Sequence, residues 1–228
     1  MTTQFATSET RKAASNTSTR RWHWWGTAAG VLGLVANIVT DPAGSIGPEQ
    51  RKGGAAVIDL VSRGGYHLGA VAGVAAVGCL LVLAAGYRRW AEQKGGSSLA
   101  LRTLPAAIGA SAAALIVGYG FKGMLAIYLP GGINQNEYPA EGLYSLFMVN
   151  DLAGFFGWWG VAFAAGCLAW LGLREAMVPR WIGVFSALAF LAPVAFIAGT
   201  GLTGFPGVLC PLWLAIVSAG QALRRSPD

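Results

Sequence analysis

Six apolar stretches, separated by short polar segments, constrain the fold of this chain more than any other feature. They cover residues 24–40, 66–87, 104–129, 147–173, 181–201 and 206–223. Each reaches or approaches the ~20 residues that a helix needs to cross the hydrocarbon core of a membrane. Because backbone polar groups in lipid must be paired inside the segment that carries them, we expect each stretch to be an α-helix.

Positive charge is sorted between the two sides of these stretches. The segments 1–23, 88–103, 174–180 and 224–228 hold 12 of the 16 Lys and Arg residues. On the other side, the first segment holds Arg51, Lys52 and Arg63, and the other two hold none. Basic loops stay cytoplasmic during membrane insertion. The sequence therefore predicts an all-α, polytopic integral membrane bundle of six transmembrane helices, with the N and C termini cytoplasmic and the cell membrane as its location.

Composition agrees with a membrane protein and limits the partners. Charged residues make up 11% of the chain, against about a quarter in soluble domains. The net charge of +6 comes from cations beside apolar segments, which indicates anionic lipid headgroups and no nucleic acid. We expect residues 1–21 to be a disordered basic cytoplasmic tail, 22–223 the transmembrane domain and 224–228 a second tail. A cleaved signal peptide is the alternative for the first stretch, but no A-x-A site follows it.

Lys122 is the one cation inside an apolar stretch. A lysine at this depth either extends its ammonium group to the interface or is buried with a partner. Asp151, beside Asn150 near the start of the next stretch, is the expected partner, because consecutive helices are usually neighbours. A Lys122–Asp151 pair would either contribute to a binding site or have a purely structural role. Tyr119 lies one helical turn from Lys122, and Trp158 and Trp159 supply further aromatic walls.

A second polar cluster precedes the second stretch. Asp59, Arg63 and His67 are spaced four residues apart, so one helix would place them on one face. The apolar residues around Asp59 indicate a short interfacial helix, and Gly64-Gly65 predicts a bend before the span. The alternative is an ordinary solvated helix with no role in binding.

The segment 130–146 is predicted to be a long loop over these groups. It carries Glu141 and several amides, holds no cation and exceeds the usual connection length. We therefore predict a polar pocket that opens outward, with aromatic walls and this loop as its roof. The predicted substrate-binding residues are Lys122, Tyr119, His67, Arg63, Asn150 and Trp158.

Several classes of site are excluded by missing residues. The chain has only two histidines and no Walker A, G-x-S-x-G or H-E-x-x-H motif. Its three cysteines lie in apolar stretches without CxxC spacing, which is typical of packing residues. We expect no metal site and no cofactor.

Glycine motifs predict close helix packing. Small residues recur along one face at Gly26 and Gly30, at Gly69 and Gly73, and at Gly154, Gly157 and Gly160. Such faces let helix backbones approach each other. They serve either this bundle or a membrane-protein partner.

Three features carry a resemblance to a known group of proteins. They are the tryptophan-led first helix, the run Val178-Pro-Arg-Trp-Ile-Gly183, and Phe205-Pro-Gly with the later Pro-Leu-Trp213. Together they resemble the six-helix membrane proteins of unknown function that are common in high-GC bacteria. The resemblance implies the fold and brings no activity with it. In size alone the chain is also similar to small integral-membrane terpene cyclases, whose acidic helix motif it lacks.

Three functions fit these observations. The first is binding or transport of a small, largely apolar molecule in the outward pocket. The second is an integral-membrane enzyme, such as an isoprenoid cyclase, that uses a carboxylic acid as general acid. Its catalytic residue would be Asp151, Asp59 or Glu141, because a carboxyl group desolvated near lipid retains its proton. The third is a structural subunit of a membrane complex.

Overall fold

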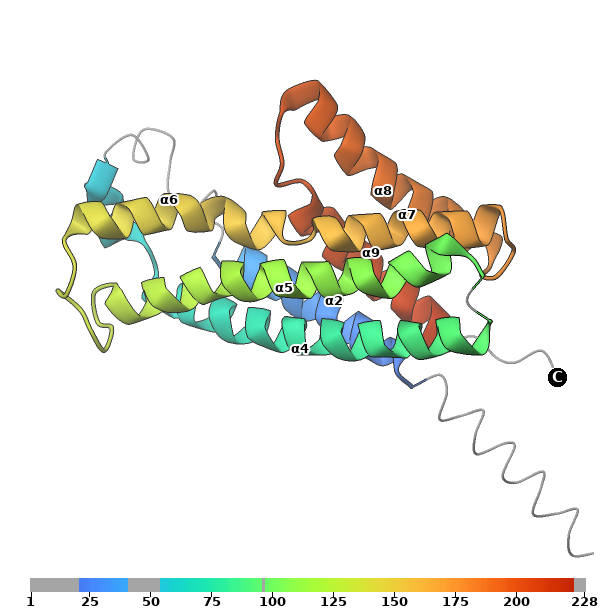
Figure 1. Cartoon of the computed structure of the whole chain (residues 1–228). Helices are drawn as coiled ribbons and strands as arrows, with labels where there is room; N and C mark the ends of the chain where they lie inside the picture. Colours follow the sequence, from blue (N-terminus) through green and yellow to red (C-terminus); the bar gives the residue numbers. More distant parts are fainter. Residues whose placement is uncertain (1–20, 41–53, 96, 224–228) are drawn as a thin grey trace, which may run out of the picture.

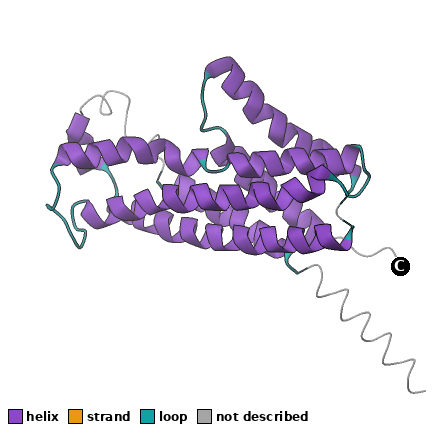
Figure 2. Cartoon of the chain, viewed as in Figure 1, coloured by secondary structure: helices purple, strands orange, loops and turns teal. Residues whose placement is uncertain are grey.

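The computed structural model describes residues 21–40, 54–95 and 97–223, apart from the side chains at 151 and 152. The elements are α2 (His23–Ile38), η2 (Gly54–Leu60), α4 (Arg63–Gln93), α5 (Leu99–Tyr128), α6 (Ala140–Phe156), α7 (Trp159–Leu173), α8 (Arg180–Thr200) and α9 (Pro206–Leu223). Figure 2 shows helices and loops, and no strand, throughout this part of the chain. The all-α prediction is confirmed. The predicted tails, apart from Arg21, lie outside the described residues.

Five helical segments are long and apolar enough to cross a membrane. They are Arg63–Gln93, Leu99–Tyr128, Ala140–Leu173, Arg180–Thr200 and Pro206–Leu223. This composition fits a multi-pass membrane protein. The first predicted span also forms a helix, α2, but its 16 residues give a length of only ~24 Å.

The helices form one elongated bundle (Figure 1). α4 and α5 run antiparallel along its whole length, α6 and α7 follow each other beside α5, and α2 and α9 lie behind. α2 packs against α4 and α9, and its small residues Ala29 and Ala36 are fully buried in the main core. α8 packs on α7 and then leans away from the bundle toward its C-terminal end.

The connections sort between the two ends of the bundle (Figure 1). The start of α2, the α4–α5 turn, the α7–α8 turn and the end of α9 share one end. We call this the basic end, because Arg21, Arg88, Arg102 and Arg174 belong to its segments. The opposite end holds η2, the start of α4, the end of α5 and the start of α6. The helices formed by successive apolar stretches therefore alternate in direction, as the sequence predicts.

The fourth apolar stretch is two helices and not one. α6 ends at Phe156, α7 begins at Trp159, and Gly157 and Trp158 form a turn between them. Ser111 of α5 compensates for the lost helical hydrogen bonds: its Oγ donates to Gly157 O at 2.7 Å and accepts from Val161 N at 2.9 Å. Helix breaks at membrane depth are tolerated where such side chains pair the freed backbone groups.

The segment 130–146 differs from the predicted loop. α6 already begins at Ala140, so only the first part of the segment is a loop. Leu143 and Phe147, one helical turn apart, are buried in a small second core with Val57 of η2 and Leu125 of α5. Burial of this apolar pair explains why the helix extends beyond the most hydrophobic stretch.

The predicted alignment of Asp59 with Arg63 and His67 is interrupted. Asp59 is exposed on η2, whereas Arg63 and His67 belong to α4. The chain turns at Val61 and Ser62, and not at the following glycines, because Ser62 caps α4: its Oγ accepts from Gly65 N at 3.3 Å. Asp59 therefore does not continue the helical face of the other two residues.

The glycine motifs pack inside this chain. All seven glycines named above would place an added Cβ within 3.2 Å of another part of the bundle. Gly30 of α2, for example, lies against the backbone of α9 at Pro211 and Ala215. A partner that used these faces would have to displace a helix of this bundle.

Candidate functional site

Lys122 is buried in the centre of the bundle. Its side chain is 1% exposed, so it does not extend to the interface. Nζ donates to Ala36 O at 2.8 Å and to Thr40 Oγ1. These acceptors belong to the last turn of α2 and the residues just beyond it, where helical carbonyls have no partner inside the helix. The ammonium group therefore caps the negative end of the α2 dipole.

Glycines and an aromatic ring make room for this cation. Gly69 of α4 and Gly154 of α6 lie so close that an added Cβ would be 3.5 Å from Lys122 Cδ and 3.1 Å from its Cε, respectively. The Tyr119 ring centroid lies 5.7 Å from Nζ, which is within the range of cation–π attraction. Residues from α2, α4, α5 and α6 thus surround one charge.

A chain of hydrogen bonds continues from this centre. Trp158 Nε1 donates to Tyr119 Oη at 3.1 Å, and Tyr119 Oη donates to Asn37 Oδ1 at 3.5 Å. Asn37 Nδ2 in turn donates to Gly207 O of α9 at 2.8 Å. Lys122, Tyr119, Asn37 and Trp158 are each buried, with 1% exposure or less. We call these four residues and Thr40 the buried network.

The predicted pairing of Lys122 with Asp151 stays a prediction. Asp151 belongs to α6, but its side chain lies outside the described residues. Its neighbour Asn150 is 3% exposed, and Asn150 Oδ1 has no hydrogen-bond partner among the residues that the structure describes.

A groove lies between α4 and α5 beside the buried network. Its volume is about 610 Å³, within the range of small-molecule sites. Arg63 and His67 line it near the start of α4, and Tyr119 belongs to its wall. Between them the lining is apolar, with Val71, Val74, Ala75, Gly120, Gly123 and Ile127 among the residues. We call this the upper groove.

The upper groove has a defined mouth. Arg63 Nε donates to Ala126 O at 3.2 Å, which ties the start of α4 to the last turn of α5. Ile133 of the following loop also lines the groove, so part of the predicted roof segment is near it. The groove opens sideways between two helices and is mostly apolar, unlike the polar, outward-opening pocket expected from the sequence.

Three of the six predicted binding residues line this groove, and three lie away from it. Arg63, His67 and Tyr119 belong to its lining. Lys122, Trp158 and Asn150 are buried, and none is among the lining residues. Tyr119 connects the two sets, because it lies fully buried behind the groove wall and its hydroxyl group belongs to the buried network.

Two of the three carboxylates proposed for the enzyme alternative are described, and neither lines the upper groove. Asp59 lies on η2 and Glu141 in the first turn of α6, and both are exposed. No group of three or more His, Cys, Asp or Glu residues able to hold a metal ion occurs among the described residues. No carboxylate is among the described residues that line the upper groove.

Sequence reasoning missed Asn37 and Thr40. Both lie at the end of the first apolar stretch, where a single amide among apolar residues was the available signal. Their role depends on Lys122, more than 80 residues later in the chain, and on α9. No local pattern links those positions.

Comparisons with protein-family models, curated proteins and solved structures return no match for this chain. The resemblance to six-helix membrane proteins of high-GC bacteria therefore stays a prediction.

Proposed function

We propose that this protein is a six-span protein of the cell membrane that binds, and in that way transports or presents, a small, largely apolar molecule. Both termini are cytoplasmic in this proposal, and α2 is the first span. α2 is short for a span, but Ala36 O in its last turn accepts from Lys122 Nζ and from Thr40 Oγ1 inside the bundle. The carbonyl groups of Ala36 and Asn37 thus have side-chain donors within the protein.

The orientation follows from the distribution of charge. The connections at the basic end carry most of the described cations, and such segments stay cytoplasmic. The opposite end, with η2 and the 129–139 loop, then faces outward. The upper groove opens in the outer half of the membrane.

The upper groove is the observation that carries the proposed function. Its apolar wall suits a hydrocarbon or isoprenoid body, and its opening between helices gives access from the lipid phase. Arg63 and His67 at the mouth suit a carboxylate or another hydrogen-bond acceptor, because a guanidinium group offers five donors. The ligand class is thus a small amphiphile with an acidic or polar end.

Tyr119 gives such a ligand a connection to the rest of the bundle. Tyr119 lies fully buried behind the groove wall, and its hydroxyl group bonds to Trp158 and Asn37. Trp158 stands at the break between α6 and α7, and Asn37 holds α9 through Gly207. A ligand that shifts the groove wall would therefore act through Tyr119 on Trp158 and on α9.

A groove-filling substitution tests the proposal. An added Cβ at Gly120 meets nothing within 4 Å, so Gly120→Phe fills the groove without a backbone clash. With dansyl-undecanoic acid as the probe, we expect energy transfer from tryptophan to dansyl in the purified protein. Gly120→Phe should weaken probe binding about tenfold or more, because its ring occupies the apolar wall.

Gly109→Phe is the matched control. Gly109 also lies on α5 with open space at its Cβ, and it does not line the upper groove. It should leave the affinity for the probe unchanged. Equal probe binding by the wild type and Gly120→Phe, with both proteins folded, would contradict the proposed function.

A further inference from the structure

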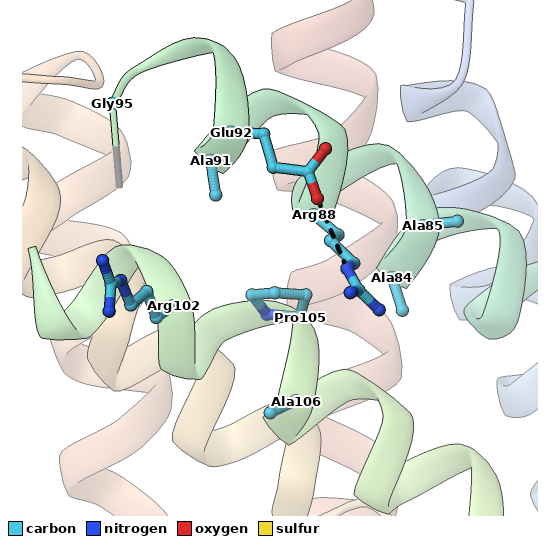
Figure 3. Close-up of a pocket in the computed structure, with 9 residues that line it drawn as sticks. All are labelled: Ala84, Ala85, Arg88, Ala91, Glu92, Gly95, Arg102, Pro105 and Ala106. Carbon is cyan, nitrogen blue, oxygen red and sulfur yellow. Dashed lines mark ion pairs between the residues drawn. The ribbon is translucent and has the colours of Figure 1, made fainter. Parts of the chain in front are cut away.

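A second pocket lies between α4 and α5 at the basic end of the bundle. Its volume is about 790 Å³. Figure 3 shows Arg88 and Glu92 on the last turns of α4 and Arg102 and Pro105 on the first turns of α5, on opposite walls. Ala84, Ala85 and Ala106 supply apolar surface deeper along the helices. We call this the lower pocket.

The charges of the lower pocket fit an anion. Arg88 Nε lies 3.5 Å from Glu92 Oε1, and both side chains are well exposed, so this pair contributes little stability. One such contact leaves most of the five donors of the Arg88 guanidinium group for another acceptor. Arg102 adds a second guanidinium group from the facing helix. Two guanidinium groups on facing walls suit the oxygen atoms of a phosphate.

The lower pocket and the upper groove belong to one helical seam. Arg88 lies 18 residues after Ala70 on α4, and Gly123 lies 18 residues after Pro105 on α5. Eighteen residues make five helical turns, so the paired positions have the same angular direction on each helix. Ala70 and Gly123 line the upper groove, and Arg88 and Pro105 line the lower pocket.

The length of this seam matches the membrane. His67 and Arg88 are 21 residues apart on α4, which corresponds to ~32 Å, close to the ~30 Å hydrocarbon thickness of a bilayer. With Arg63 and His67 at the headgroup level of one leaflet, Arg88 and Arg102 reach that of the other. The small apolar residues beside the arginines then lie at acyl-chain depth. An ion from solution would use the arginines alone, whereas a phospholipid would use both parts.

We propose that the lower pocket binds an anionic phospholipid, with the headgroup phosphate between Arg88 and Arg102 and an acyl chain along Ala84, Ala85 and Ala106. The proposal does not depend on the ligand of the upper groove. It predicts that the protein selects anionic lipids at its basic end by a defined pair of side chains, beyond the general attraction of its net charge.

Lipid retention by the full chain tests this proposal. The protein is extracted from nanodiscs of mixed phosphatidylglycerol and phosphatidylcholine, and bound lipid is counted by native mass spectrometry. The wild type should retain phosphatidylglycerol over phosphatidylcholine. The double variant Arg88→Gln/Arg102→Gln should lower that retention about tenfold, because two charge-assisted contacts to phosphate are lost.

Two further variants separate the site from general charge. Arg89→Gln/Arg180→Gln removes the same charge at the same end from exposed residues outside the pocket lining, and it should keep the wild-type retention. Ala106→Trp fills the apolar part with the arginines intact, and it should lower retention as well. A thermal shift is measured in parallel with inorganic phosphate and with phosphatidylglycerol.

Three results would overturn the proposal. Equal loss of phosphatidylglycerol in both double variants would show attraction by net charge alone. Full retention in Ala106→Trp would show that no acyl chain lies in the pocket. Stabilisation by inorganic phosphate equal to that by phosphatidylglycerol would assign the arginines to a free anion.

Discussion

Lys122 belongs to α5, and its ammonium group lies against the C-terminal end of α2, which explains why a cation is tolerated deep in an apolar bundle. A lone charge at membrane depth is costly, but here the ammonium group meets the Ala36 carbonyl and the Thr40 hydroxyl. The carbonyl group at the end of α2 thus gains a hydrogen-bond donor, and the buried ammonium group gains hydrogen-bond acceptors.

Loss of this cap should destabilise the bundle. Lys122→Met keeps most of the side-chain volume and removes the ammonium group that Ala36 O accepts from. We expect a decrease of about 2 kcal/mol in the free energy of unfolding, measured by denaturant titration in detergent. Lys94→Met, at the exposed end of α4, is the control and should change stability by less than about 0.5 kcal/mol. A Lys122→Met protein as stable as the control would contradict the capping role.

The sequence indicated that Lys122 matters but not which groups it meets. Its depth in an apolar stretch made burial a reasonable hypothesis from residue type alone. Asn37 and Thr40 could not be predicted, because their contacts arise only when α2, α5 and α9 come together. Tyr119 was predicted from its spacing to Lys122, and its place between the groove and the buried network is a property of the packed structure.

Among the helices, α4 shows how glycine placement sets the packing. Gly73 faces α5, where an added Cβ would lie 2.2 Å from Tyr119 Cγ. Gly78, five residues later on α4, has nothing within 4 Å of its added Cβ. Gly73 therefore allows close contact between α4 and α5, whereas Gly78 lies beside open space.

This difference gives a matched pair of substitutions. Gly73→Ala should destabilise the protein by about 1–3 kcal/mol, because the buried Tyr119 ring has to shift. Gly78→Ala should be neutral or stabilise it by up to about 1 kcal/mol, since alanine favours the helix. Unfolding midpoints in one detergent compare the two variants. Equal effects would mean that α4 and α5 do not pack as described.

The break between α6 and α7 could not be predicted from hydropathy. The stretch 147–173 is apolar throughout, and hydropathy measures partitioning into lipid and not backbone pairing. The turn at Gly157 and Trp158 depends on Ser111, which lies 46 residues earlier and supplies both replacement hydrogen bonds. The early start of α6 at Ala140 likewise depends on a second core that η2 completes.

For the whole molecule, the sequence predicted the class of fold and the order of the helices. Each of the six apolar stretches contains a helix or a pair of helices, and the described parts of the basic segments lie at one end of the bundle (Figure 1). It did not predict the seam between α4 and α5. To predict the seam, one must know how α4 and α5 are rotated relative to each other about their axes. Charge and hydropathy do not determine that rotation.

In the proposed transmembrane arrangement, the upper groove lies in the outer leaflet and the lower pocket in the inner one. Both proposals therefore depend on which side of the membrane each loop faces. Ser97 in the α4–α5 turn and Ile133 in the α5–α6 loop are exposed and lie at opposite ends of the bundle. They are suitable positions for a direct test of sidedness.

Cysteine labelling gives the most direct measurement. Ser97→Cys and Ile133→Cys are made separately in a chain whose three native cysteines are replaced by alanine, and right-side-out membrane vesicles are treated with an impermeant maleimide. Ile133→Cys should be labelled in sealed vesicles, and Ser97→Cys only after the vesicles are opened. Labelling of both positions in sealed vesicles, or of Ser97→Cys alone, would contradict the proposed arrangement.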